Sequence, residues 1–246
     1  MLDKRALLRG ALVSGVAFSL PKIARSETGT ASLQISPTTL ALSPGGVVTA
    51  NLYNSGDATA NAQARLKRWT QDDSGDVLAD TDNVVVSPPF ASLAPQASQI
   101  LRIADLSTPA SVSETAYRLL VNQLPSAGAL SGAHVEILLA FSVPVFIAGS
   151  AQTPPSLSYA IVNRGADMLL AVYNAGGTHA RLASLRLRAA SGAVIMAIPG
   201  LAGYALPNAA AIIKIPAAQA TAARDADLFL QTQLDSQPQQ ITRRAG

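Results

Sequence analysis

Short runs of Val, Ile, Leu, Thr and Tyr recur along this chain about every 10 to 15 residues, separated by Gly, Pro, Asn and Asp. This spacing is typical of antiparallel strands joined by turns, and no segment shows strong helical periodicity. The sequence therefore predicts an all-β protein, and seven strands within about 115 residues fit an immunoglobulin-like β-sandwich. The expected strands of this first sandwich are Ser32–Leu42, Val47–Tyr53, Ala60–Trp69, Val84–Ser87, Gln99–Ile103, Thr115–Leu124 and Val135–Ile147.

The two halves of the chain share a weak internal repeat. Asn51–Gly56 (NLYNSG) is similar to Ala171–Gly176 (AVYNAG), and each copy turns at Asn-x-Gly before a long strand that contains Ala-Arg-Leu. Shared hairpin chemistry explains this repeat about as well as two similar domains do, but a Pro-containing linker, Gly149–Ser156, separates the copies. We therefore expect two immunoglobulin-like β-sandwich domains in tandem, residues 27–149 and 150–246.

Only one segment has helical propensity. The Ala-rich stretch Ala217–Ala226 is short and is flanked by strand-like sequence, so we expect it to form a loop or a single helical turn.

Residues 1–26 have the composition of an export signal. A positively charged start is followed by a short apolar stretch, Gly10–Leu20, and by a small-x-small cleavage motif, Ala24–Ser26. Because about 20 apolar residues are needed to cross a bilayer, removal of this signal peptide is favoured over its retention as a membrane anchor. Lys4 and Arg5 also fit a loose twin-arginine signal, so the sequence leaves both the general and the twin-arginine export route open.

The basic character of the full chain comes from this signal. It holds five of the 18 basic residues and one of the 15 acidic ones, so the remainder has 13 basic and 14 acidic residues. This balance gives no support for binding to nucleic acid or to an anionic membrane, because either would need basic residues clustered on the folded part. Cysteine is absent, which excludes thiolate chemistry and cysteine metal sites.

No pattern of catalytic residues is visible. The two histidines, His134 and His179, fall in different expected domains, so neither a histidine-dependent triad nor a metal site is expected. The acidic segment Asp72–Asp82 fits either a calcium loop or a solvated hairpin, and it lacks the closing Glu of a calcium loop. The glycines do not form a phosphate-binding loop. We therefore expect a protein that is not an enzyme and that holds no cofactor and no metal.

Ten short segments, taken in their order and spacing, form a combined pattern. They are Ile35–Leu40, Leu52–Gly56, Ala64–Trp69, Ser87–Pro89, Ala94–Arg102, Glu114–Leu119, Gln123–Pro125, Ser142–Phe146, Val172–Gly176 and Gly203–Pro207. Together they resemble the PapD-like periplasmic chaperones of pilus assembly, in particular the branch associated with spore-coat-U-type subunits. The resemblance implies two immunoglobulin-like domains set at an angle, a periplasmic location, and a chaperone that binds secreted pilus or coat-type subunits and delivers them to an outer-membrane usher.

The resemblance also implies that the last strand of the first domain pairs with the open edge of a subunit and places alternate apolar side chains in its groove. Val135, Ile137, Leu139 and Phe141 occupy every second position of this strand and would share one face. The pattern alone fits equally well a strand that packs only its own core. Because Leu138 and Ala140 make the other face apolar as well, we expect one face to serve the home core and the other to await a partner.

Members of this family use two basic residues in the interdomain cleft to hold the C-terminal carboxylate of the subunit. The matching positions here are Thr39 and Pro144, neither of which is basic. Arg118 and Arg102 are therefore the candidate carboxylate anchors, although each also fits an ordinary structural or surface arginine.

Two further residues concern the region between the domains. Glu114 matches a position that forms an interdomain ion pair in the family, but Ala148 replaces its basic partner, so no role is predicted for Glu114. Trp69 lies at the end of a strand and is expected to anchor the core or the edge of the domain.

The main alternative function is a secreted structural or adhesive β-sandwich, such as a pilus subunit. Such subunits are usually single domains with a missing strand, whereas two complete sandwiches are expected here. A periplasmic hydrolase is the third hypothesis, and it would need a nucleophile with an activating base.

Overall fold

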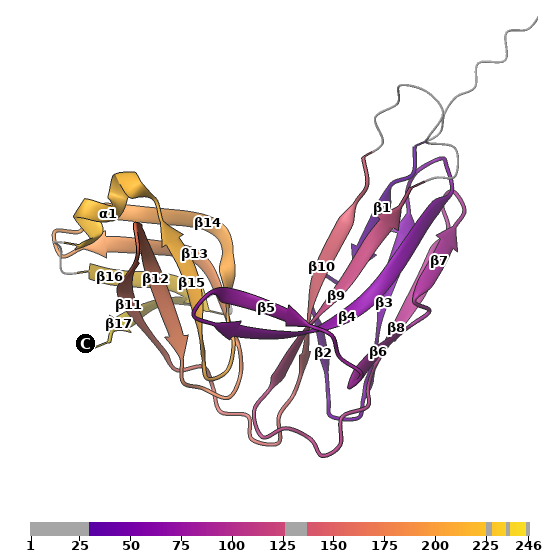
Figure 1. Ribbon diagram of the computed structural model, residues 1–246, viewed down its shortest axis with the longest axis horizontal. Coiled ribbons are helices and arrows are strands. Elements are labelled where there is room, and N and C mark those ends of the chain that lie inside the picture. Colours follow the sequence, from indigo (N-terminus) through magenta and orange to yellow (C-terminus); the bar gives the residue numbers. More distant parts are fainter. Residues whose placement is uncertain (1–29, 126–136, 225–227, 235–236, 245–246) are drawn as a thin grey trace, which may run out of the picture.

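The computed structural model describes residues 30–125, 137–224, 228–234 and 237–244. Strands account for most of these residues and form two bodies set at an angle to each other (Figure 1). The predicted all-β architecture with two tandem immunoglobulin-like domains is confirmed. The expected signal, residues 1–26, lies outside the described residues.

The first body is a sandwich of two sheets. Its strands are β1 (Leu33–Ser36), β2 (Leu40–Leu42), β3 (Val47–Asn54), β4 (Ala60–Asp72), β5 (Gly75–Ala79), β6 (Val84–Ser87), β7 (Phe90–Leu93), β8 (Ser98–Asp105), β9 (Thr115–Leu124) and β10 (Ala140–Ile147). One sheet has the order β1-β3-β8-β6, and the other has the order β2-β10-β9-β4-β5, with β7 also paired to β4. All pairs are antiparallel except β2 with β10, which is parallel.

The strand expected over Ser32–Leu42 is divided between the two sheets. β1 pairs with β3 in one sheet, while β2 pairs with β10 in the other. The break falls at Pro37, which has no backbone N–H for a ladder. The sequence also missed β5 and β7; β5 forms a hairpin with the end of β4, so the acidic segment is a hairpin.

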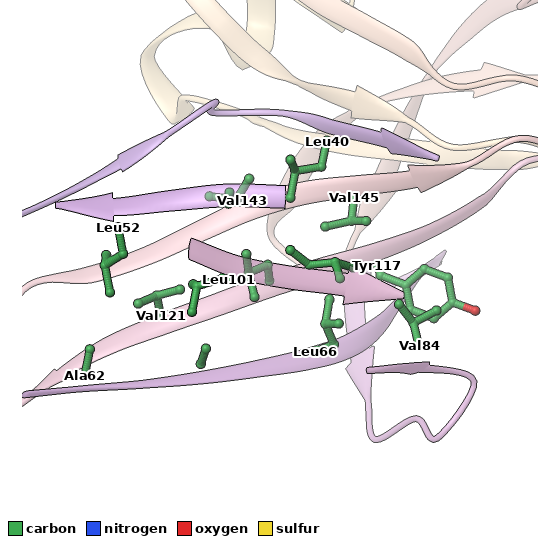
Figure 2. Close-up of a cluster of buried hydrophobic side chains, with 14 of the residues drawn as sticks. Leu40, Leu52, Ala62, Leu66, Val84, Leu101, Tyr117, Val121, Val143 and Val145 are labelled. Carbon is green, nitrogen blue, oxygen red and sulfur yellow. The ribbon is translucent and has the colours of Figure 1, made fainter. Parts of the chain in front are cut away.

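Apolar side chains from both sheets meet in one core (Figure 2). Leu52 on β3 and Leu101 on β8 come from one sheet, and they face Leu66, Leu119 and Val145 from the other. Each of these lies at an alternate position of its strand, which is why the period-two pattern predicted the sandwich correctly.

The second body consists of one seven-stranded sheet, in the order β14-β13-β16-β17-β11-β12-β15, whose inward side chains form a second core. A single helix, α1, buries Ala223 in this core, so the Ala-rich stretch is a short helix and not a loop. The elements are β11 (Leu157–Arg164), β12 (Asp167–Asn174), β13 (Ala180–Ala189), β14 (Val194–Ala205), β15 (Ala209–Ile215), α1 (Ala217–Arg224), β16 (Leu228–Leu234) and β17 (Gln237–Arg243).

The internal repeat places an equivalent buried asparagine in each body. The Asn54 Oδ1 accepts from the backbone N–H of Gly56 at 3.1 Å, and its Nδ2 donates to the carbonyls of Ala58 at 2.8 Å and Leu93 at 3.1 Å. Asn54 therefore joins its own turn to a segment 39 residues away.

Asn174 repeats this arrangement in the second body. Its Oδ1 accepts from the N–H of Gly176 at 2.9 Å, and its Nδ2 donates to the carbonyls of Thr178 at 2.8 Å and Ala205 at 3.1 Å. The glycine two positions after each asparagine is also equivalent. A Cβ on Gly56 or on Gly176 would lie only 2.1 Å from a backbone oxygen of the segment that precedes the first strand of the same body. Turn chemistry alone does not require these long-range contacts, so the repeat reflects two similar domains.

We predict that Asn54→Ala lowers the free energy of unfolding by about 2 to 4 kcal/mol, since it removes a fully buried side chain together with its hydrogen bonds to the backbone of Gly56, Ala58 and Leu93. The measurement is urea denaturation of the full chain. Asn51→Ala is the matched control, because Asn51 is exposed on the same strand, and its effect should stay within about 0.5 kcal/mol. Equal effects of the two substitutions would contradict this role for Asn54.

Candidate functional site

The outer edge of β10 is only partly covered. β10 pairs with β9 along its full length, from Ala140 to Ile147. On its other side it pairs with β2 only over Val145–Ile147. Among the described residues, nothing pairs with the outer edge over Ala140–Pro144, and we call this stretch the open edge. The last strand of the first domain therefore has backbone groups available for another strand.

Side chains near the open edge change from exposed to buried along the chain. Ile137 is 76% exposed and Leu138 is 42% exposed, whereas Leu139 and Phe141 are partly buried against the first core. Val143 is fully part of that core. Val135 lies outside the described residues, and the described strand begins at Ala140 instead of Val135.

Two of the predicted donor residues, Leu139 and Phe141, already pack in part against the home core. They lie on the same face as Val143 and Val145, so they point toward the rim of that core. On this face, burial increases from Ile137, which precedes β10, to Val143 within it. Whether one of these side chains is exposed or buried in the home core therefore depends more on its position along the chain than on the face it occupies.

Aromatic side chains from both domains meet where the two bodies contact each other. Trp69 and Phe146 of the first body pack with Tyr204 and Leu206 of the second in a small buried cluster. The Trp69 and Tyr204 rings are arranged edge to face, with centroids 5.7 Å apart. Trp69 is therefore an anchor at the domain edge, as predicted.

Arg118 is held at this domain interface. Its guanidinium carbon lies 3.6 Å from the centroid of the Trp69 ring, and only 16% of its side chain is exposed. The nearest carboxylate is that of Asp76 on β5, 4.0 Å away. Burial lowers the pKa of the Arg118 guanidinium from its usual value, and Asp76 and Tyr204 oppose this shift. Arg118 stays cationic with only a distant counterion.

The other residues considered for carboxylate binding lie in different places. Pro144 is buried in β10 directly opposite Arg118 in the register, and Thr39 is exposed just before β2. Arg102 is exposed on β8, in the other sheet, where it pairs with Thr49 and Ser87. The structure therefore brings Arg118, and not Arg102, next to the last strand.

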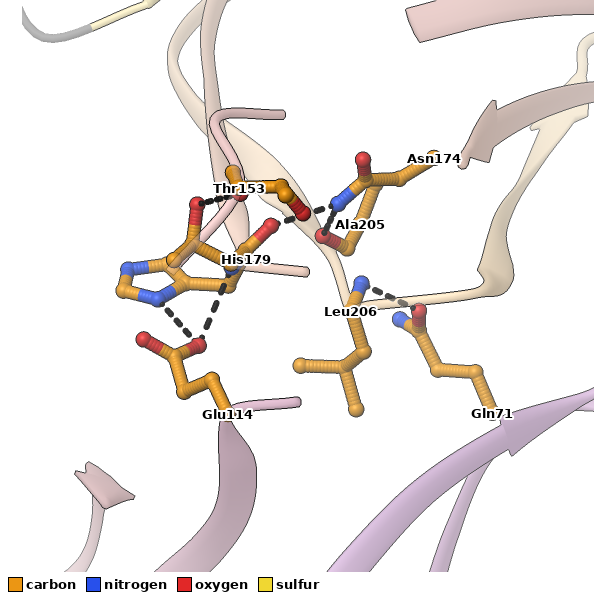
Figure 3. Close-up of polar contacts among 8 residues, drawn as sticks. Gln71, Glu114, Thr153, Asn174, His179, Ala205 and Leu206 are labelled. Atoms are coloured by element: carbon orange, nitrogen blue, oxygen red, sulfur yellow. Dashed lines mark hydrogen bonds and ion pairs between the residues drawn. The ribbon is translucent and has the colours of Figure 1, made fainter. Parts of the chain in front are cut away.

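Polar contacts also join the domains (Figure 3). Glu114 Oε1 accepts from the backbone N–H of His179 at 3.0 Å and lies 2.7 Å from its Nδ1. The His179 ring stacks on Phe146 with centroids 3.5 Å apart. The side chain of Gln71 donates to the carbonyl of Tyr204 at 2.7 Å and accepts from the N–H of Leu206 at 2.9 Å.

These contacts correct the sequence analysis of Glu114 and His179. Glu114 does form an interdomain pair, but its partner is His179 from the turn before β13 and not a residue at the end of β10. The two residues are 65 positions apart, so no local pattern could have joined them. Because His179 also stacks on Phe146, the second domain contacts the strand that carries the open edge.

The described residues offer no group of three or more His, Asp or Glu side chains that could hold a metal. His134 lies outside the described residues. Within the same described part, no helix is long and apolar enough to cross a membrane.

Comparison with known proteins agrees with this geometry. Residues 32–151 match the family described as pili and flagellar-assembly chaperone, PapD N-terminal domain. Among curated proteins, no sequence matches significantly.

Several solved structures have a similar fold. A chain of the CsuC–CsuE chaperone and tip adhesion subunit complex, from archaic chaperone-usher Csu pili of Acinetobacter baumannii, is 22% identical; the match covers 87% of this chain and 100% of that one, with a TM-score of 0.70. A chain of the SafA pilin and SafB chaperone complex of Salmonella enterica is 16% identical; the match covers 86% of this chain and 96% of that one, with a TM-score of 0.60. The E. coli chaperone DraB is 16% identical; the match covers 88% of this chain and 99% of that one, with a TM-score of 0.58.

At these identities the structural matches establish the fold, and the family match establishes the class of the first domain. Residues 32–151 form a PapD N-terminal domain of the pili and flagellar-assembly chaperone family, and a second immunoglobulin-like domain follows it. The predicted resemblance to this family is confirmed.

We predict that Glu114→Ala loosens the contact between the domains, because it removes the acceptor for both the backbone and the ring of His179. Small-angle X-ray scattering should show a larger radius of gyration and a broader distance distribution. Glu114→Gln is the control, since its amide oxygen can still accept both hydrogen bonds. Identical scattering from wild type and Glu114→Ala would contradict this assignment.

Proposed function

We propose that this chain is an exported periplasmic chaperone that stabilises pilus or spore-coat-U-type subunits by donating the open edge of β10 to their incomplete sandwiches. The open edge is the observation that most supports this proposal. Among the described residues, its outer backbone groups over Ala140–Pro144 have no strand partner, and the exposed apolar side chains of Ile137 and Leu138 directly precede it. A subunit that lacks one strand needs both features. The match of the first domain to pilus-assembly chaperones supports the same function.

The donated segment would contribute two kinds of interaction. Backbone groups of the open edge would pair with the subunit's edge strand, which gives affinity with little dependence on sequence. Ile137, Leu139 and Phe141 would face the subunit's groove. Full burial of an exposed apolar side chain contributes about 1.5 to 3 kcal/mol, and the gain is smaller for Leu139 and Phe141, which are already partly buried. Ile137 has the most to gain, because it is the most exposed of the three. Val135 is proposed as a fourth donor residue on the sequence pattern alone.

Arg118 is the proposed anchor for the C-terminal carboxylate of the subunit. The usual basic positions are occupied by Thr39 and Pro144, and Arg118 lies directly across from Pro144. Its stacking on Trp69 fixes the plane of the guanidinium, which suits bidentate binding of a carboxylate. Since its nearest carboxylate is 4.0 Å away, Arg118 retains donors for a ligand.

The proposed partners are secreted subunits and an outer-membrane usher. Similar structures support this, since their descriptions name a tip adhesion subunit bound with CsuC and a pilin bound with SafB. We further propose that residues 1–26 are removed on export, and that the chain performs no catalysis and needs no cofactor. Two immunoglobulin-like domains favour a chaperone over a pilus subunit, the main alternative, because such subunits are usually single domains.

We predict that Ile137→Asp or Leu139→Asp abolishes capture of a subunit, because a carboxylate cannot enter an apolar groove without losing its hydration. The measurement is co-purification with secreted proteins encoded beside the chain's own gene, after co-expression. Val47→Asp is the matched control, since Val47 is also an exposed apolar residue but lies on the other sheet. Capture at the wild-type yield by both donor variants would refute the donor assignment.

A second prediction separates the two candidate anchors. Arg118→Ala should weaken subunit binding by about 2 to 3 kcal/mol, because a charge-assisted pair is lost from a partly buried site. Arg102→Ala should leave it within about 0.5 kcal/mol, because Arg102 is exposed on the other sheet. Both are measured as dissociation constants of the purified complex. The reverse order of effects would remove Arg118 as the anchor.

A further inference from the structure

The backbone groups of β10 alternate between its two neighbours. Leu139 accepts from the N–H of Gln123 on β9 at 2.8 Å, whereas Ala148 donates to the carbonyl of Leu42 on the opposite side at 2.9 Å. Odd-numbered residues therefore direct their N–H and C=O groups to β9, and even-numbered residues direct theirs to the outer edge. Along the open edge, the outward-directed residues are Ala140, Ser142 and Pro144.

Pro144 has no N–H to offer. The donors of the open edge are therefore those of Ala140 and Ser142, after which the proline interrupts the series. Beyond Pro144, β2 covers the same edge from Val145 onward. An added strand therefore finds no N–H donor at Pro144, and from Val145 onward β2 already occupies this edge.

The side chains of β10 also cease to be available to a partner at this place. Val143, Val145 and Ile147 are buried in the home core and cannot enter a partner. Ile137, Leu139 and Phe141 precede them and are exposed or only partly buried. The available N–H groups and the available side chains of this segment therefore both end before Val143 and Pro144.

Pro144 leaves the hydrogen bonds between β10 and β9 intact. Pro144 faces Arg118 in a position where neither residue exchanges hydrogen bonds with the other, because the bonded pairs are Val143 with Leu119 and Val145 with Tyr117. A proline at any odd position of β10 would remove a hydrogen bond to β9. Its place at an even position removes a donor from the outer edge alone.

We propose that Pro144 is a register stop, a residue that fixes how far a subunit strand can extend along β10 and so selects the register of the complex. This inference rests on the proposed function. It specifies a partner whose edge strand accepts hydrogen bonds from the N–H groups of Ala140 and Ser142 but from none at residue 144, and whose groove accepts the side chains of Ile137, Leu139 and Phe141. Subunits that need a longer donated strand would be rejected.

Two substitutions on this edge test the proposal, because one should slow dissociation of the subunit and the other should speed it. Pro144→Ala restores an N–H, so the subunit should dissociate several-fold more slowly, and the new amide of residue 144 should be protected from hydrogen exchange only in the complex. Ser142→Pro moves the stop two residues back without removing a hydrogen bond to β9, so dissociation should be roughly tenfold faster. Ser142→Ala keeps the N–H and is the control.

The probe is the subunit that co-purifies with the wild-type chain in the co-expression experiment described above. If the wild type captures no secreted protein, the proposed function fails and the register stop fails with it. If the wild type captures a subunit but the amide of residue 144 in Pro144→Ala exchanges equally fast in the free and bound protein, the register stop alone is refuted. It is also refuted if Ser142→Pro dissociates at the rate of Ser142→Ala.

Discussion

Within the part of the chain that the structure describes, the outer backbone groups of β10 over Ala140–Pro144 have no strand partner, and the rest of the molecule is arranged around this constraint. Such an edge can add a strand from any compatible chain, which provides a binding mode and also creates a hazard of aggregation. The chain restricts the hazard by keeping the open edge short. β2 covers one end of it over Val145–Ile147, and Pro144 removes a donor next to that cover.

The division of the first strand segment between two sheets makes this arrangement possible. Because the chain changes sheets at Pro37, β1 pairs with β3 while β2 reaches only the last three residues of β10. A continuous strand over Ser32–Leu42 in one sheet would have covered more of β10 or none of it. The same short β2 therefore completes the sandwich and leaves an edge for a partner.

The second domain is connected to this edge through Phe146. His179 stacks on the Phe146 ring and contacts Glu114, the residue before β9. Trp69 and Tyr204 add a buried aromatic contact nearby, and Arg118 rests on Trp69. The end of β10, the proposed anchor and the domain interface thus form one packed unit, so that the angle between the domains and the position of Arg118 depend on each other.

Local patterns predicted most of the fold, because alternation and turn residues act over a few positions. Val84–Ser87 and Thr115–Leu124 were predicted with their observed bounds, and the Asn-x-Gly repeat indicated the two similar domains. The strand division at Pro37, the short β7 and the Glu114 to His179 contact could not be predicted, since each depends on long-range pairing. Leu139 and Phe141 were identified by alternation, but their place at the rim of the home core depends on where the sandwich ends.

Hydrogen exchange of individual β10 amides, measured with and without a captured subunit, shows whether this edge is donated as a strand. We expect the Ala140 and Ser142 amides to exchange rapidly in the free protein and to become protected in the complex, whereas the Phe141 and Val143 amides, directed at β9, should be protected in both. Protection of Ala140 and Ser142 in the free protein, or their continued rapid exchange in the complex, would contradict strand donation by this edge.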